Sequence, residues 1–303
     1  MAEIRFDGQV AIVTGAGGGL GRSHALEFAR RGAKVVVNDL GATVDGSGGG
    51  SEAANRVVEE IRAAGGEAIA NGSSVVDDAG VKRMVADAMD AWGRIDILVA
   101  NAGILRDRSF AKMEISDFEV VLDVHVMGTV KPALAVWEIM RAQNYGRIVV
   151  TTSASGLYGN FGQSNYSAAK AGLIGLMNTL KLEGRKNNIH VNAIAPVAAT
   201  RMTQGIMPPE FLEALGPEKV TPGVVYLCSA EAPTGAILTA GAGVFALAQI
   251  VETEGAFLGP AASAENVRDA WSRISDPAGV EAYFGGGGQT AKILRHIQGD
   301  RET

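Results

Sequence analysis

Fold class follows from one segment near the N-terminus, Val10-Ala11-Ile12-Val13-Thr14-Gly15-Ala16-Gly17-Gly18-Gly19-Leu20-Gly21. A short apolar run of this kind is typical of a buried strand, and the amphipathic pattern beyond the glycines predicts a helix over 19–31. Glycines permit a tight turn and let backbone N–H groups approach a pyrophosphate at the helix N-terminus, where the helix dipole favours an anion. The segment indicates a dinucleotide-binding strand–turn–helix unit, with a glycine turn that holds no ligand as the alternative.

The next predicted strand, 34–38, ends in Asp39, eighteen residues beyond Gly21. A carboxylate at this distance accepts hydrogen bonds from an adenosine ribose and repels a 2′-phosphate. No Arg or Lys lies beside Asp39, nor between Ala16 and Gly21. The pattern therefore predicts NAD rather than NADP as the cofactor.

A second constellation combines Tyr166 and Lys170 with Ser153, which stands thirteen residues upstream of the tyrosine. Residues four apart on a helix share one face, and a neighbouring ammonium favours the phenolate, which would lower the pKa of Tyr166. A phenol adjusted in this way can act as a general acid or base, and a serine hydroxyl can hold the reacting oxygen. Taken alone, the pair is also compatible with an ordinary helix surface.

Predicted strands alternate with predicted helices along most of the chain, which is typical of an α/β fold with a doubly wound parallel sheet and helices on both faces. About seven strands are expected, at 10–14, 34–38, 67–71, 96–100, 146–152, 189–194 and 235–239. The helices are expected at 19–31, 52–64, 78–92, 117–142, 165–185 and 220–230.

The pattern changes near residue 248, so we expect a domain over 1–247 and a mainly helical C-terminal extension over 248–303. Within the extension, 265–275 and 290–298 are predicted helices, and the four glycines at 285–288 are predicted to form a flexible break. The glycine-rich segment 41–50 is predicted to be a flexible linker.

Over roughly residues 5–245 the chain resembles the short-chain dehydrogenase/reductase family, whose Rossmann-type sheet matches the predicted one. The resemblance depends on Thr14-Gly15-x-x-x-Gly19-x-Gly21, on Asn101-Ala102-Gly103, and on Ser153, Tyr166 and Lys170. Longer strings resemble the (3R)-hydroxyacyl-CoA dehydrogenases within this family. They are 38–41, 101–110, 153–163, 183–190 and 201–204.

The resemblance implies that Tyr166 exchanges the proton, that Ser153 binds the reacting oxygen, and that both contact the substrate. Lys170 would hold the nicotinamide ribose. The full set of residues implied to bind the cofactor is Thr14, Gly15, Gly19, Leu20, Gly21, Asp39, Ser74, Val75, Asn101, Ala102, Gly103, Tyr166, Lys170, Ala198, Ala199 and Thr200.

The sequence departs from the family at two places. The usual Pro-Gly after the sixth strand is Pro196-Val197, which weakens the assignment of the three residues that follow. His125 stands where most of the family has Asn, whose backbone carbonyl holds a water that feeds the lysine. A carbonyl survives the exchange, so this relay is compatible with His125, although a core histidine is the alternative.

Composition excludes several classes of function. A net charge of −6 with no basic stripe argues against a nucleic-acid partner. Gly235 to Ile250, the most apolar segment, is too short to span a bilayer, so no membrane partner is expected. The four histidines show no ligand spacing, so no metal is expected. A single Cys228 and no recognisable targeting signal predict a cytoplasmic protein.

The leading hypothesis is an NAD-dependent enzyme that oxidises a secondary alcohol, a (3R)-3-hydroxyacyl-CoA by resemblance, in fatty-acid β-oxidation. The alternatives are a 3-oxoacyl reductase, a steroid or other hydroxyl dehydrogenase, and a non-catalytic NAD-binding scaffold. Helices 117–142 and 165–185 are implied to pair across a two-fold axis, which predicts a homodimer or homotetramer. The segment 203–217 is predicted to be a substrate lid.

Overall fold

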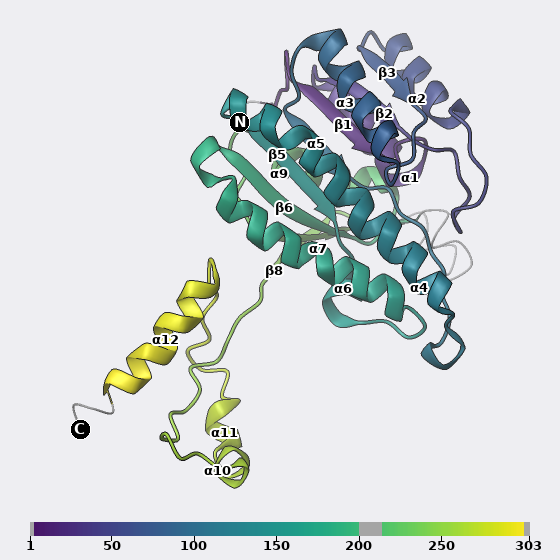
Figure 1. Cartoon of the computed structure of the whole chain (residues 1–303). Helices are drawn as coiled ribbons and strands as arrows, with labels where there is room; N and C mark the ends of the chain where they lie inside the picture. The colour runs from purple at the N-terminus through teal and green to yellow at the C-terminus, as the bar shows by residue number, and fades with distance from the viewer. Residues whose placement is uncertain (1–2, 200–213, 300–303) are drawn as a thin grey trace. The chain divides into compact units, whose positions relative to one another are not determined.

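The computed structural model describes residues 3–199 and 214–299. It divides into two compact units, Met1–Leu247 and Ala248–Thr303, which are described separately below (Figure 1). Thr200 and most of the predicted substrate lid lie outside the described residues.

The larger unit is built on one sheet with the strand order β3-β2-β1-β4-β5-β6-β7-β8. Every printed pairing from β3 through β7 is parallel, so the seven predicted strands are confirmed. Their bounds are β1 Val10–Thr14, β2 Lys34–Asn38, β3 Ala68–Asn71, β4 Ile97–Ala100, β5 Gly146–Thr151, β6 Ile189–Pro196 and β7 Ile237–Gly241. The strand order reverses between β1 and β4, which is where such sheets bind ligands.

An eighth strand, β8 (Val244–Ala248), extends the sheet beyond the predicted seven. It is joined to β7 through Ala242 and Gly243, whose φ angles of 51° and 81° are those of a tight hairpin turn. Alanine rarely adopts a positive φ, so Ala242 itself carried no recognisable turn signal.

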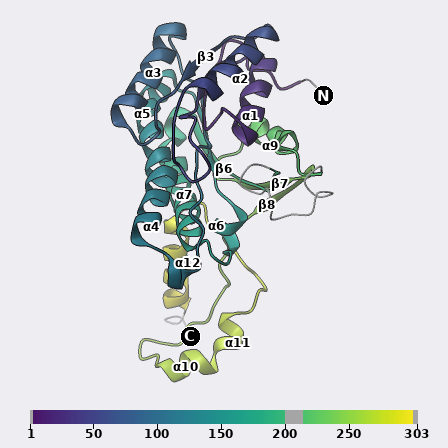
Figure 2. The same cartoon turned by 90° about the vertical axis from the view of Figure 1, so that its right-hand side faces the viewer.

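Helices cover both faces of the sheet, as predicted (Figure 2). One face carries α1 (Gly19–Arg30), α2 (Glu52–Ala63) and α9 (Thr221–Leu227). The other face carries α3 (Asp78–Trp92), α5 (Gly128–Gln143) and α7 (Ser164–Glu183). Because both faces are covered, the central strands are mainly apolar, and β1, β4 and β5 are fully buried.

The single helix predicted over 117–142 was wrong in detail. The structure has α4 (Ile115–Leu122), a π-helical turn over Asp123–Met127, and then α5. One inserted residue in a helix does not disturb apolar periodicity enough to be seen in a sequence, and such turns occur often at functional sites. Ile115–Gln143 is long and apolar enough to cross a membrane by length and composition alone, but α5 packs on β4 and β5 of the sheet.

Short helical elements complete the larger unit. They are η1 Phe110–Lys112, α6 Ala154–Tyr158, η3 Arg185–Asn187 and η4 Pro217–Lys219. None of them was predicted. At three to five residues each, they are too short to show a helical period.

The smaller unit contains α10 (Ala264–Asp269), α11 (Trp271–Ile274) and α12 (Gly286–Gly299). A capping box begins α10, because the Ser263 side chain accepts from Asn266 N–H and the Asn266 side chain accepts from Ser263 N–H. The predicted break at the four glycines was wrong, since α12 runs through three of them. Lys292 anchors that helix by donating to Thr253 O at 2.7 Å.

The largest fully buried side chain in the described residues is Arg147, at the start of β5. Its guanidinium donates to the carbonyls of Gly146, Asn188 and Ser229 at 2.8 Å and of Ala230 at 3.3 Å. It also lies over the Tyr145 ring, 4.3 Å from the centroid. Burial lowers the pKa of this guanidinium. Backbone carbonyls from three segments thus replace the carboxylate partner that a buried arginine usually has.

Candidate active site

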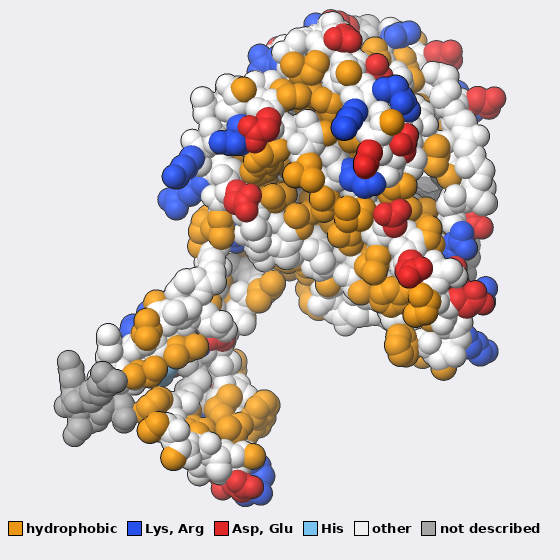
Figure 3. All heavy atoms as spheres, in the orientation of Figure 1, with side chains coloured by type: hydrophobic (Ala, Val, Ile, Leu, Met, Phe, Trp, Pro, Cys, Tyr) orange, Lys and Arg blue, Asp and Glu red, His pale blue; other side chains and the backbone are white. Residues whose placement is uncertain are grey.

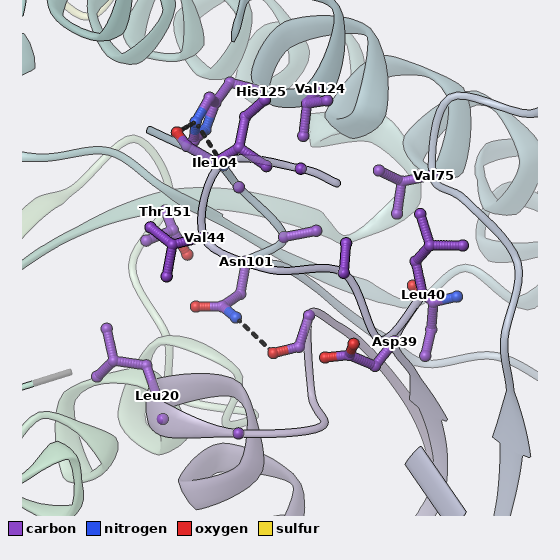
Figure 4. A pocket seen from close by; sticks show the side chains of 18 of the residues that line it. Leu20, Asp39, Leu40, Val44, Val75, Asn101, Ile104, Val124, His125 and Thr151 are labelled. Atoms are coloured by element: carbon purple, nitrogen blue, oxygen red, sulfur yellow. Dashed lines mark hydrogen bonds between the residues drawn. The ribbon is translucent and has the colours of Figure 1, made fainter. Parts of the chain in front are cut away.

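A cavity of about 240 Å³ lies at the carboxyl ends of the central strands (Figure 4). Of the residues implied by resemblance to bind a cofactor, eleven line it. They are Gly15, Gly19, Leu20, Asp39, Ser74, Val75, Asn101, Ala102, Gly103, Tyr166 and Lys170. Sequence segments more than 150 residues apart therefore meet where the strand order reverses.

The floor of the cavity is the turn between β1 and α1, and it has no room for side chains at Gly17 and Gly21. A Cβ on Gly21 would lie 2.2 Å from the carbonyl oxygen of Gly15. One on Gly17 would lie 2.7–2.8 Å from Ala53 and Asp39. Gly15 itself has a φ of 62°, a conformation that glycine adopts without strain. The glycines thus bring the backbone to the cavity wall at the N-terminus of α1, which suits a phosphate group.

Asp39 lies directly after β2 and lines the same cavity. Its Oδ2 accepts from Gly17 N–H at 2.7 Å, and its Oδ1 accepts from Gly41 N–H at 2.6 Å. These two bonds fix the carboxylate next to the glycine turn. A negative charge held there opposes a second negative group and favours a ribose hydroxyl.

Thr14 is fully buried and does not line the cavity, but it fixes a segment that does. Its Oγ1 accepts from the N–H groups of Asn101 and Ala102 at 3.0 and 3.1 Å. The Asn101 amide in turn donates to the carbonyls of Thr14 and Gly15 at 3.0 and 3.2 Å. This exchange ties the end of β4 to the glycine turn.

Ser153 and Tyr166 are brought together by two helices. Ser153 caps α6 by accepting from Ser155 N–H at 3.2 Å, and Tyr166 lies in the first turn of α7. The Ser153 hydroxyl is close enough to the Tyr166 phenol to affect its pKa. Burial raises the pKa of Tyr166, the Ser153 hydroxyl lowers it, and the charge of Asp107 raises it. Burial outweighs the rest, so the lowered phenol pKa expected from the helix spacing was wrong for this state.

Lys170 lies one helical turn beyond Tyr166 and is only 3% exposed. Its Nζ donates to Thr151 O at 2.5 Å and lies 5.5 Å from the centre of the Tyr166 ring. Burial lowers the pKa of Lys170 to about 7. An ammonium poised near neutrality can therefore be charged or neutral under ordinary conditions, and its charge is felt by the phenol.

The side chain of His125 projects from the π-helical turn into the cavity wall (Figure 4). Its Nε2 lies 2.8 Å from the Ile104 carbonyl and 3.2 Å from the Ile104 amide, and its ring meets that of Tyr166 edge-on at 5.1 Å. Burial and the charge of Lys170 hold the pKa of His125 well below its usual value, so the imidazole is neutral. Its Nδ1 is buried without a protein partner. A Cβ on Gly103 would collide with this ring.

Some residues implied by resemblance do not line the cavity. Gly21 supports the turn from beneath, Ala198 is buried, and Ala199 N–H donates to Leu215 O. Pro196 does line the cavity, from the end of β6.

The sequence analysis missed a wall of the cavity that comes from the supposed linker after β2. The residues concerned are Leu40, Ala42, Thr43, Val44 and Gly46. A glycine-rich composition suggested flexibility, whereas the segment is internally hydrogen-bonded. The available signal was its position, because it directly follows Asp39 at the end of a central strand.

The donor set and shape of the cavity fit a dinucleotide. A floor of backbone atoms at a helix N-terminus suits the pyrophosphate, Asp39 suits a ribose diol, and Lys170 adds a donor at the opposite end. The two hydroxyls of Ser153 and Tyr166 stand beside that end, where they could bind the oxygen of an alcohol or ketone.

Comparison with known proteins agrees with this arrangement. The family model for short chain dehydrogenases matches residues 9–210. The mouse peroxisomal multifunctional enzyme type 2 is 52% identical over 279 residues, which are 91% of this chain and 38% of that protein. The chain spans 38% to 61% of the lengths of such enzymes from mouse, Dictyostelium discoideum and Drosophila melanogaster.

Two solved structures are similar as well. Full-length peroxisomal multifunctional enzyme type 2 from Drosophila melanogaster superposes with a TM-score of 0.80 and 41% identity, covering 97% of this chain and 50% of that one. A 7α-hydroxysteroid dehydrogenase in complex with NADH and 7-oxo-glycochenodeoxycholic acid superposes with a TM-score of 0.70 and 31% identity, covering 79% of this chain and 95% of that one.

The prediction of a cytoplasmic protein was wrong by this comparison, because the mouse, Dictyostelium and Drosophila relatives are all named as peroxisomal enzymes. The prediction depended on the lack of a recognisable targeting signal. The lack of a signal in a sequence carries no information about where a protein is delivered.

Proposed function

Because the chain belongs to the short-chain dehydrogenase family, we propose that it is an NAD-dependent dehydrogenase that oxidises a (3R)-3-hydroxyacyl-CoA to the 3-oxoacyl-CoA. One observation carries the proposal: Tyr166 has the Ser153 hydroxyl and the buried Lys170 ammonium beside it, next to a cavity that fits a dinucleotide. The acyl-CoA assignment is supported by the similarity to the multifunctional enzymes, as is a place in fatty-acid β-oxidation.

In this proposal Tyr166 removes the proton of the substrate hydroxyl, and Ser153 holds the same oxygen in place. Bound NAD⁺ supplies the hydride acceptor. Burial holds the proton on the phenol, so a positive charge is needed to release it. Lys170 provides that charge when it is protonated, and its pKa of about 7 makes the charge available at neutral pH.

Asp39 selects NAD over NADP, because its carboxylate stands where a 2′-phosphate would add negative charge. The similarity to a dehydrogenase solved with NADH supports the same cofactor. Residues 1–247 form the dehydrogenase domain in this proposal, and residues 248–303 are a C-terminal extension.

The protein is a homodimer or homotetramer in this proposal, and it pairs through α5 and α7. Apolar side chains gather over the face formed by α4, α5 and α7 (Figure 3), and Leu134 on α5 is 69% exposed. On α7, Ala169 and Leu173 are buried within the chain's own core and leave no apolar surface for a partner. A monomer mass by light scattering at micromolar concentration would contradict the pairing.

An initial-rate panel tests the activity. Both epimers of a medium-chain 3-hydroxyacyl-CoA and a steroid alcohol are each assayed with NAD⁺ and with NADP⁺. The expected result is turnover of the (3R) epimer with NAD⁺ and little of the (3S) epimer. Preference for (3S), or oxidation of the steroid alone, would overturn the substrate assignment.

A further inference from the structure

The loop between β2 and α2, residues 40–50, closes over one side of the cavity. It leaves the sheet after β2 and reaches the segment that follows β4, although β1 lies between these two strands. Val44 and Gly46 of the loop line the same cavity as Gly18 and Gly19 of the glycine turn. A ligand in the cavity therefore has the turn on one side and this loop on another.

The loop holds its own shape. Thr43 N–H donates to Ser47 O at 2.8 Å, and Gly46 N–H donates to Thr43 O at 3.0 Å. The Thr43 hydroxyl also donates to the Asp45 carboxylate at 2.5 Å. The loop can therefore move as a rigid unit that keeps its internal hydrogen bonds.

Two hydrogen bonds hold the loop against the segment after β4. Leu105 N–H donates to Val44 O at 3.0 Å, and Arg106 Nε donates to Asp45 O at 2.7 Å. A guanidinium bond is among the stronger kinds because its donor is charged. Arg106 is itself oriented by Asp117 on α4, whose Oδ1 lies 3.1 Å from Nη1.

The segment after β4 is the fixed partner of this contact. His125 contacts both the N–H and the carbonyl of Ile104. Asn165, fully buried beside Tyr166, donates to the carbonyl of Arg106 at 3.0 Å. The loop, by contrast, is exposed from Asp45 through Gly50. When the contact opens, the loop is therefore the side that moves.

We propose that Arg106 is a positioning residue for the dinucleotide: its bond to Asp45 O holds the 40–50 loop closed over the cavity and slows cofactor release. The inference rests on the proposed function in that the cavity takes NAD(H). It assigns Arg106 no part in proton or hydride transfer.

Stopped-flow displacement of NADH, followed by its fluorescence, tests this role. Arg106→Ala should release NADH about tenfold faster or more, since a bond from a charged donor is lost. KM for NAD⁺ should rise in step, while kcat should not fall. The NADH release rate of Arg106→Lys should lie between those of wild type and Arg106→Ala. One ammonium cannot bind both Asp45 O and the Asp117 carboxylate with the geometry of a guanidinium. Arg62→Ala is the matched control, since Arg62 also donates to a backbone carbonyl, that of Ala68, and does not line the cavity.

Hydrogen exchange in the wild-type protein gives a reading that does not depend on a variant's folding. Saturating NADH should slow exchange of the Leu105 amide, whose bond to Val44 O crosses the contact, more than exchange of the Gly46 amide, whose bond to Thr43 O lies within the loop. Release within twofold of wild type in a folded Arg106→Ala, or no change in these amides, would overturn the role of Arg106 alone. Failure of the wild-type protein to bind NADH would overturn the proposed function as well.

Discussion

The two ends of the cavity are built in opposite ways. At the glycine turn the useful atoms belong to the backbone, and close packing around Gly17 and Gly21 keeps side chains away. At the other end the useful atoms belong to side chains, and burial changes their chemistry: the pKa of Lys170 falls to about 7 and that of Tyr166 rises. The first end works mainly by shape, which leaves no room for added atoms at Gly17 and Gly21. The second works by charge, which depends on the dielectric environment.

Tyr166→Phe should separate the two ends most clearly, because it should affect turnover and leave cofactor binding unchanged. The variant should lose about 10²–10⁴ in kcat, the usual worth of a general acid or base, while NADH binding and thermal stability stay close to wild type. Tyr158→Phe is the matched control, because this tyrosine is 76% exposed. Steady-state kinetics decide the matter. If Tyr166→Phe kept more than about a tenth of wild-type kcat, another group would be the base.

Cofactor choice should depend on the backbone-built end alone. Asp39 should favour NAD⁺ over NADP⁺ by about 2 kcal/mol or more, roughly thirtyfold in kcat/KM. Asp39→Ser should narrow that ratio and leave kcat with NAD⁺ largely unchanged, whereas the exposed Asp90→Asn should do neither. Equal kcat/KM for the two cofactors in the wild-type enzyme would count against the role of Asp39.

Added volume should harm the turn only where the backbone is close. Gly21→Ala places a Cβ 2.2 Å from Gly15 O, so its free energy of unfolding should fall by about 1–3 kcal/mol and its NADH affinity should drop. Gly18→Ala, with nothing within 4 Å and an extended φ of −168°, should be nearly neutral in stability. Denaturant titration compares the two. Equal destabilisation by the two substitutions would mean that the close contact at Gly21 is not the cause.

Lys170, at the charge-built end, should make the free energy of unfolding depend on pH. Lys170 has a pKa of about 7 when folded and near 10.5 when unfolded, so between these values the unfolded chain binds more protons. The free energy of unfolding should therefore rise with pH from about 7 to 10, by at most about 1.4 kcal/mol per pH unit. Lys170→Met should flatten this rise, and the exposed Lys186→Met should not. If the free energy of unfolding rose with pH equally in Lys170→Met and wild type, the pKa of Lys170 would not be lowered in the folded protein.

The sequence predicted the backbone-built end more completely than the charge-built one. Glycine spacing and the position of Asp39 are local patterns, and the parallel strand order brings them together. The triad Ser153, Tyr166 and Lys170 was also identified, yet the direction of the Tyr166 shift was not, because burial depends on the whole fold. The loop wall at Val44 was missed for the same reason. Its contacts, to Leu105 and Arg106, are some sixty residues away.

The hairpin at Ala242 and the π-helical turn at His125 were missed for a different reason. Each is a local departure from a regular period. Gly241 and Gly243 flank Ala242 and were not used as a turn signal, whereas no residue type at 123–127 indicates a π-helical turn. Predictions from periodicity describe the regular parts of elements, whereas this chain positions its imidazole through an irregular one.

The buried Arg147 has a consequence for the order of folding. Two of its four acceptors, the carbonyls of Ser229 and Ala230, lie more than eighty residues further along the chain, just after α9. Until that segment packs against β5, the guanidinium lacks two of its acceptors and stays hydrated. The start of β5 therefore stays accessible to solvent. We expect β5, β6 and α9 to gain protection in one kinetic phase in pulse-labelled exchange. An Arg147→Met chain should let β5 and β6 become protected before α9 does.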